Sequence, residues 1–188
     1  RLPGVEFFVE PVKEHRFVLV LRAEGLGGDI SESDPQQVGA APLDIRPLPS
    51  TSDHAASQRT ADLVNDFTAQ ARRILSGEPT ANMVLLRGLD KRPSIPTMSN
   101  VYGLRCAAIA VYPMYRGLAK LVGMTALPTG TKLVDEFDTL EQHWNDYDFF
   151  YLHFKYTDSR GEDGDFAAKV AMVEEFDRYV PRVMALQP

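Results

Sequence analysis

The amino-acid sequence predicts an α/β fold, with a mostly parallel sheet flanked by helices and a smaller α+β section before it. Three observations support this prediction. Residues 149–154 are an almost wholly apolar and aromatic run, which is typical of a strand covered on both faces. Apolar residues at helical spacing follow this run after a polar loop. The second part of the chain has the pattern strand, helix, helix, strand, helix, and helices of crossover length favour parallel strands.

The composition limits the class of protein. Of the 188 residues, 44% are hydrophobic and 24% are charged, as in ordinary globular domains. A net charge of −6 argues against a nucleic-acid or membrane partner, although a local basic pocket for a phosphorylated metabolite stays open. No apolar run is long enough to cross a bilayer. The single cysteine, Cys106, cannot form an internal disulfide, so we expect a reduced, cytoplasmic setting.

The first section begins with two strand patterns, residues 4–12 and 16–23, which we expect to form a hairpin or neighbouring strands. Residues 25–49 are rich in Gly, Ser, Asp and Pro and predict a long polar loop. Residues 57–76 predict an amphipathic helix, because apolar residues recur on one face and Gly77 marks its end.

The second section opens with strand patterns at residues 81–88 and 104–111, the latter made of small residues. A helix with proline in its first turn is predicted at 113–122. A further helix is predicted at 133–144, ahead of the aromatic strand. Its acids are most simply interpreted as a solvated outer face, namely Asp135, Glu136, Asp138 and Glu141.

An acidic segment at 155–165 joins the aromatic strand to a predicted helix at 166–180, which Pro181 closes. Two interpretations of the acids are open. Asp158 and Glu162, four residues apart, could be hard-oxygen ligands of a divalent cation at the carboxyl end of a strand. The acids could instead be N-caps and first-turn charges of the helix. Residue types alone favour the second interpretation.

The segment LHFKYTDSRGEDGDFAAKVAMVEEFD resembles the metal-site segment of the archaeal-type, cofactor-independent phosphoglycerate mutases, which belong to the alkaline phosphatase superfamily. The matching positions are His153, Lys155, Thr157, Asp158, Gly161, Asp163, Gly164, Asp165, Lys169, Glu174 and Asp177. One position departs from the pattern, since Glu162 stands where the family has a metal-binding histidine. The resemblance implies that Asp158 is a metal ligand, with Glu162 beside it.

The resemblance extends to the first section. EHRFVLVLRAEGLGGDISESDP is similar to a strand and loop of the family's insert domain, and ANMVLLRG is similar to its Asn-x-x-x-x-Arg-Gly segment. This implies an insert or cap domain at 1–78 and part of the metal-binding core at 79–188. It also implies phosphate contacts from Arg16, Arg22 and Arg87, whose planar forks suit phosphate oxygens. The alternatives are surface residues on a half-buried strand for the first two and a salt-bridged rim residue for Arg87.

The implied activity is the interconversion of 3-phosphoglycerate and 2-phosphoglycerate through a phosphoserine, with two divalent ions (Mn²⁺ or Mg²⁺) and without 2,3-bisphosphoglycerate. The serine and the remaining ligands are expected in segments of the same enzyme outside this chain, so that this fragment alone would be inactive. Glu162 could shift the preference towards Mg²⁺ or Ca²⁺, or mark the loss of the metal. Two alternatives stay open: a related phosphotransferase or phosphatase acting on another phosphorylated small acid, and a non-catalytic relative that serves as an interaction module.

Overall fold

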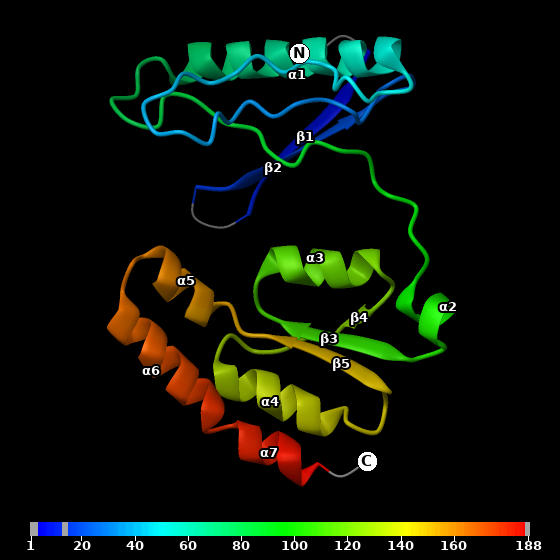
Figure 1. Cartoon of the computed structure of the whole chain (residues 1–188), viewed down its shortest axis with the longest axis vertical. Helices are drawn as coiled ribbons and strands as arrows, with labels where there is room; N and C mark the ends of the chain where they lie inside the picture. The colour runs from blue at the N-terminus through cyan, green and yellow to red at the C-terminus, as the bar shows by residue number, and fades with distance from the viewer. Residues whose placement is uncertain (1–3, 13–14, 187–188) are drawn as a thin grey trace. The chain divides into compact units, whose positions relative to one another are not determined.

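The computed structural model describes residues 4–12 and 15–186. The chain forms two compact units, Arg1–Pro93 (unit 1) and Ser94–Pro188 (unit 2) (Figure 1). Each unit has a hydrophobic core of its own. Among the described residues, every helix is too short or too polar to cross a membrane.

Unit 1 begins with a hairpin. Strand β1 (Glu6–Pro11) pairs antiparallel with β2 (Phe17–Arg22), which confirms the hairpin expected from the two strand patterns. Residues on β2 alternate between half-buried and exposed, as a strand with one covered face requires. Phe17, Leu19 and Leu21 pack against the core of the unit. The other face presents apolar side chains to solvent, including Phe8 and Val20.

The long helix α1 (His54–Leu75) covers the hairpin in unit 1 and confirms the predicted amphipathic helix. It begins three residues before the predicted start, because the Asp53 side chain accepts the N–H of Ala56 at 3.0 Å and caps it. Its fully buried residues, Ala61 and Val64, meet buried residues of the polar loop and of the segment after the helix. These are Ile30, Ile45 and Leu86. Two residues of the loop, Ile30 and Ile45, therefore belong to the core.

The segment after α1 corrects the prediction of a strand at 81–88, because these residues form no ladder. Leu86 instead donates its N–H to Ser33 Oγ at 2.7 Å, and its carbonyl accepts the N–H of Ser33 at 3.0 Å. This docking holds the segment on unit 1. The compact units thus divide at Pro93, later than the predicted domain boundary near Glu78; the assignment of the two domains as cap and core stays a prediction.

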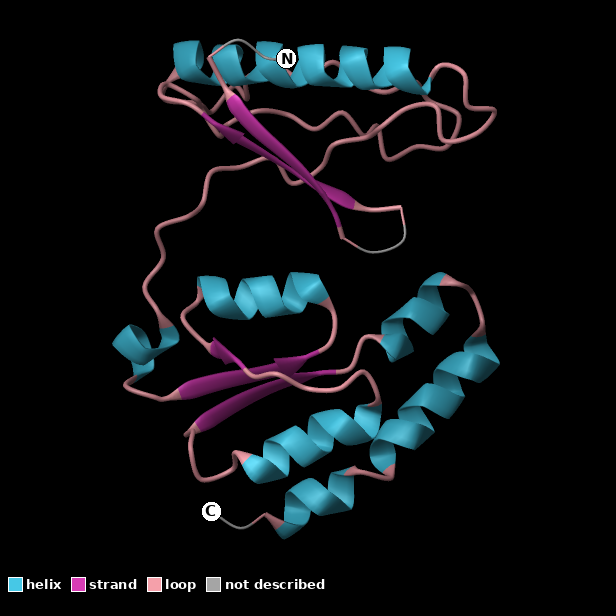
Figure 2. Ribbon diagram, turned by 180° about the vertical axis from the view of Figure 1, so that it is seen from behind, coloured by secondary structure: helices cyan, strands magenta, loops and turns pink. Residues whose placement is uncertain are grey.

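Unit 2 contains a parallel sheet with strand order β4 (Thr125–Ala126), β3 (Cys106–Ala110) and β5 (Phe149–His153). Helix α3 (Pro113–Leu121) lies on one face and α4 (Leu133–Gln142) on the other (Figure 2). The small residues of β3 are all buried, which lets the helices approach the central strand closely. The predicted α/β class with a mostly parallel sheet is confirmed.

Two predictions, one about the cover of the aromatic strand and one about Pro181, were wrong. Strand β5 lies at an edge of the described sheet and is only half-buried, whereas the aromatic run indicated cover on both faces. The predicted helix 166–180 is confirmed as α6 (Phe166–Asp177), which ends three residues earlier than predicted, and a separate helix, α7 (Val180–Ala185), follows it. Pro181 lies in the first turn of α7, where its missing N–H costs no hydrogen bond, so it opens a helix rather than closing one.

Two short elements escaped prediction. Helix α2 (Met98–Tyr102) lies in a proline-containing segment; Thr97 caps it by accepting the N–H of Asn100, and Gly103 ends it at φ +69°. Strand β4 has only two residues and precedes a segment that contains Pro128 and Gly130. Elements this short carry too few residues to show a period.

Candidate metal centre and phosphate contacts

The acidic segment after β5 is helical, which corrects its prediction as a loop. Residues 156–162 form α5 (Tyr156–Glu162), and Asp158 and Glu162 are four residues apart on it. This spacing places both carboxylates on the same helix face. Gly164 then reverses the chain at φ +72°, and α6 begins. The candidate pair therefore lies just past the carboxyl end of β5, where open α/β sheets hold their ligands.

The acids of this segment divide between the two interpretations left open by the sequence. Asp165 is an N-cap, because its Oδ1 accepts the N–H of Ala168 at 2.9 Å at the start of α6. Asp163 lies 3.5 Å from the guanidinium of Arg160. Asp158 is a first-turn charge of α5, as the second interpretation allows, whereas Glu162 is the last residue of that helix and is neither an N-cap nor a first-turn charge. The helix-cap interpretation thus accounts for only part of the cluster.

Lys155 links the two candidate ligands. Its ammonium is ion-paired with Asp158 Oδ2 and lies 3.6 Å from Glu162 Oε2. The hydrogen bond from Lys155 lowers the pKa of Asp158, and the same bond raises the pKa of Lys155. The Asp158 carboxyl is therefore ionised at neutral pH, as a metal ligand must be.

The donor chemistry of the pair fits a hard divalent cation. Both groups offer carboxylate oxygens, and the side chains of Asp158 and Glu162 are each 57% exposed, so another segment or a ligand can reach them. Within residues 4–12 and 15–186, no group of three or more His, Cys, Asp or Glu side chains gathers to hold a metal. The described residues thus bring two carboxylates together, with the Lys155 ammonium between them.

Aromatic side chains surround Lys155 at the carboxyl end of the sheet. The ammonium lies 5.8 Å from the ring centre of Tyr112, and Tyr115 stacks on His153 with ring centres 3.5 Å apart. Burial lowers the pKa of His153. No described residue forms a hydrogen bond with its buried Nδ1. The neutral Nδ1 of His153 is thus a polar group near the acidic pair that has no hydrogen-bond partner among the described residues.

The sequence interpretation missed Glu136, which was expected on a solvated face. Its side chain is 1% exposed, and no described residue bonds its Oε2. Burial raises its pKa to about 7, although the N–H of Val111, just past β3, partly offsets this effect. Helical spacing could have found it, since position 136 shares a face with the buried Leu133 and Leu140.

The three candidate phosphate arginines all lie in unit 1, in different surroundings. The guanidinium of Arg22 lies 4.8 Å from the ring centre of Phe8. Arg87 is 61% exposed and its Nε lies 3.5 Å from Asp34 Oδ2, as the salt-bridged rim alternative described. Arg16 precedes β2 and Arg22 ends it, so about 20 Å of extended chain separates their Cα atoms.

Comparison with known proteins assigns the chain to a class. A family model described as the metalloenzyme superfamily matches residues 21–187, and the chain belongs to this superfamily. Among curated proteins, the chain is 44% identical over 188 residues to one from Thermotoga maritima and 47% identical over 191 residues to one from Thermus thermophilus. Both are named "probable 2,3-bisphosphoglycerate-independent phosphoglycerate mutase". Each alignment covers all of this chain and 46% of the relative, so the chain spans about half the length of these proteins.

Solved structures agree with this classification. The cofactor-independent phosphoglycerate mutase of Thermoplasma acidophilum is 27% identical, with a TM-score of 0.53 over 81% of this chain and 44% of that one. A Pyrococcus horikoshii protein, 24% identical, has a TM-score of 0.61 over 71% of this chain and 41% of that one, and indicates the fold alone.

Proposed function

We propose that the protein carrying this chain is a metal-dependent phosphoglycerate mutase that interconverts 3-phosphoglycerate and 2-phosphoglycerate through a phosphoserine. The observation that carries this proposal is the 43–47% identity, along the whole chain, to relatives bearing that name. The serine nucleophile lies outside this chain in the proposal. Residues 1–78 act as the cap, residues 79–188 as part of the core, and 2,3-bisphosphoglycerate takes no part.

Asp158 and Glu162 are the proposed metal ligands. Their shared helix face and exposure, and the ionised state of Asp158, support this role. Two divalent ions, Mn²⁺ or Mg²⁺, when bound, would activate the nucleophile and neutralise the charge of the transferring phosphoryl group. Lys155 holds the two carboxylates together without metal, which lowers the repulsion between them. A carboxylate at position 162 favours Mg²⁺ more than an imidazole would.

Arg22, Arg87 and Arg16 are the proposed phosphate contacts. Arg22 has an exposed guanidinium held by Phe8, a contact that leaves its N–H groups available to an anion. Arg87 can exchange Asp34 for phosphate at small cost, because an exposed ion pair contributes little. About 20 Å of extended chain separates Arg16 from Arg22, so they are not expected to contribute equally to one phosphate group, and substitution of each by Gln should raise KM by a different factor.

The test uses the full-length protein and two matched variants. Asp158→Asn should lower mutase activity by about 100-fold or more and reduce bound Mn²⁺, because a ligand charge is removed. Asp163→Asn is the control, since this exposed acid lies in the same segment and pairs with Arg160. Activity is followed by coupling 2-phosphoglycerate formation to its dehydration, and metal by elemental analysis. If the two variants have equal activity, Asp158 is not a metal ligand of the site.

A second candidate function is a related phosphotransferase or phosphatase for another phosphorylated small acid. The specific observation in its favour is Glu162, a charged oxygen donor where the resembling enzymes have histidine. A panel of phosphorylated acids, each tested for transfer and for phosphate release, separates this from mutase activity. Glu162→His should raise the Mn²⁺ affinity of a mutase site.

A non-catalytic interaction module is the remaining alternative. Its support is the Lys155 ammonium, which already neutralises part of the charge of the carboxylate pair in the absence of metal. Titration of the full-length protein with Mn²⁺ and Mg²⁺ decides this question. Failure to take up either ion, with no change on Asp158→Asn, would favour the module over the enzyme.

A further inference from the structure

The two strands of the hairpin in unit 1 contribute unequally to its core. Cross-strand partners lie on the same face of an antiparallel pair, so Phe7 shares a face with Leu21, and Val9 shares it with Leu19. Leu19 and Leu21 of β2 pack against the core, whereas all six residues of β1 are exposed. The described core of unit 1 is therefore covered over β2 and open over β1.

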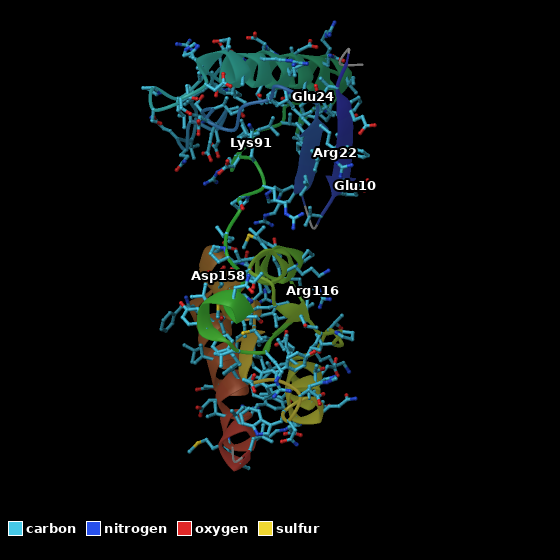
Figure 3. All side chains as sticks on the ribbon, turned by 90° about the vertical axis from the view of Figure 1, so that its right-hand side faces the viewer. Glu10, Arg22, Glu24, Lys91, Arg116 and Asp158 are labelled. Atoms are coloured by element: carbon cyan, nitrogen blue, oxygen red, sulfur yellow. The ribbon has the colours of Figure 1, made fainter. Side chains whose placement is uncertain are left out.

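The composition of the two hairpin faces does not match their exposure. The face that carries Phe7 and Val9 is wholly apolar, because it also includes Pro11, Phe17, Leu19 and Leu21. The opposite face mixes apolar and charged side chains, namely Glu6, Phe8, Glu10, Val18, Val20 and Arg22. Figure 3 labels Glu10 and Arg22, two of these charged residues. A wholly apolar face is expected to be buried, yet Phe7 on the apolar face is 45% exposed and Phe8 on the mixed face is 40% exposed.

The backbone of β1 also lacks a partner on its outer edge in the part of the chain that the structure describes. The sheet of unit 1 has two strands, so alternate N–H and C=O groups of β1 point away from β2. Edge strands are commonly protected by lysines, bulges or inward-pointing charges. Strand β1 contains no lysine, pairs without a bulge and has apolar inward residues, and Pro11 is its last residue. Its edge is therefore open to another strand.

The length of the relatives indicates what covers this edge. The alignments include all of this chain but 46% of the relatives from Thermotoga maritima and Thermus thermophilus, so more than half of each relative lies outside the matched region. Strand β2 has an open edge too, but its inward side chains are already packed, so the uncovered apolar residues single out β1. A two-stranded sheet is marginal by itself and gains stability from a third strand.

We propose that a segment of the full-length polypeptide outside these 188 residues pairs with β1 as a third strand and lays apolar side chains over Phe7 and Val9. A strand fits this surface better than a helix, because it also satisfies the N–H and C=O groups on the edge of β1. This pairing belongs to the fold of the whole polypeptide and does not depend on the mutase activity.

Photo-crosslinking of the full-length protein tests which segment covers β1. Phe7→p-benzoylphenylalanine should crosslink within one molecule to a peptide outside residues 1–188, which mass spectrometry of the digested protein identifies. Phe8→p-benzoylphenylalanine is the matched control, because position 8 has similar exposure but lies on the opposite face. It should give little of this crosslink. Asp158→Asn, combined with the label at position 7, should lose mutase activity and keep the crosslink, so the two proposals fail separately.

Three crosslinking results overturn the proposal. The first is no crosslink from position 7, or one that stays within residues 1–188. The second is an equal yield of the same outside peptide from positions 7 and 8, because the cover would then not be specific to the apolar face. The third is a crosslink between two molecules that fades on dilution, which would assign the edge of β1 to a second copy.

Hydrogen exchange of the unmodified full-length protein tests the pairing without any substitution. With a third strand in place, every amide of residues 6–10 is hydrogen-bonded and should exchange about 100-fold or more slowly than in an unstructured chain. With the hairpin alone, alternate amides of this strand stay open to water. Mass spectrometry that resolves single amides distinguishes the two patterns. Protection of alternate amides only would overturn a paired third strand, even if a crosslink forms.

Discussion

The two ends of β5 each carry an acid paired with a base, and the two pairs differ in geometry. At the amino end, Arg105 donates to Asp148 from Nη2 at 2.7 Å, from Nε at 3.1 Å and from its backbone N–H at 2.8 Å. The side-chain hydrogen bond lowers the pKa of Asp148 to about 2. At the carboxyl end, the single ammonium of Lys155 is shared between Asp158 and Glu162.

This difference separates a structural pair from one that can accept a ligand. The guanidinium fork engages both oxygens of Asp148 and joins the segment before β3 to the start of β5. An ammonium is a point charge that rotates and can be displaced, and two carboxylates share it at the carboxyl end. An added cation would therefore bind weakly at Asp148, whose two oxygens are both engaged, and more tightly at Asp158 and Glu162. Glu136 extends the comparison, because this buried acid has no cationic partner among the described residues.

The largest expected effect concerns Glu136, the buried acid that has no cationic partner among the described residues. Burial raises the pKa of Glu136 from its ordinary value to about 7, so the folded state holds the proton more tightly than the unfolded state. The stability from this proton is complete below pH 4.5 and is lost as pH rises through 7. Glu136→Gln should therefore be more stable than the parent at pH 8, by up to about 3 kcal/mol, and nearly equal at pH 4.5.

Chemical denaturation at the two pH values checks this prediction, with the fluorescence of Trp144, the single tryptophan, as the signal. Glu174→Gln is the control, because this acid is exposed on α6. A stability difference that does not change with pH, or that grows towards low pH, contradicts a buried and protonated Glu136.

An intermediate effect is expected from removing each base in turn. Lys155→Gln should tighten Mn²⁺ binding by about tenfold, because the competing positive charge beside Asp158 and Glu162 is gone. Arg105→Gln should leave Mn²⁺ binding unchanged and lower the melting temperature, because its hydrogen bonds to Asp148 are structural. Metal titration and thermal unfolding of both variants measure the contrast. Weaker Mn²⁺ binding in Lys155→Gln would show that the lysine supports the ligands rather than competing with the ion.

The smallest expected effect separates the acids within the acidic segment. Asp165→Ala should cost about 1 kcal/mol, because α6 loses its N-cap hydrogen bond to Ala168. Asp163→Ala should cost less than about 0.5 kcal/mol, since its pair with Arg160 is exposed. Urea denaturation followed at Trp144 compares the two. A larger loss of stability in Asp163→Ala than in Asp165→Ala would mean that the pair of Asp163 with Arg160, rather than the N-cap of α6, stabilises this segment.

The elements that were predicted well are those with a sustained period and a clear end. The hairpin, α1, β3, α3, α4 and β5 all follow apolar spacing that the local chain imposes. Capping adds to this, as with Asp53 at the start of α1. The placement of Asp158 at the carboxyl end of β5 was likewise predictable, because a strand followed by a helix puts the connecting residues there.

The failures arise where a single contact outweighs the pattern. Residues 81–88 look like a strand, but Ser33 pairs with Leu86 through its side chain on one side, and the segment joins no ladder. Residues 156–162 look like a loop, yet the carbonyl of Lys155 accepts the N–H groups of Asp158 and Ser159 and starts a helix. Pro181 follows one periodic run and lies in the first turn of the next helix, and the pattern alone does not say to which of the two it belongs.

Residue order alone determined the α/β class, the positions of the main helices and strands, and the family to which the chain belongs, because periodicity, caps and motif spacing are properties of neighbouring residues. The three-dimensional structure decided the surroundings of each acid. In the folded chain Glu136 is buried, Asp165 caps α6, and the Lys155 ammonium lies between Asp158 and Glu162. The physical reason is that the charge state and availability of a carboxylate depend on what surrounds it in space; for Glu136 the distant end of β3 supplies those surroundings, and for Asp158, Glu162 and Asp165 the helical geometry of their own segment does.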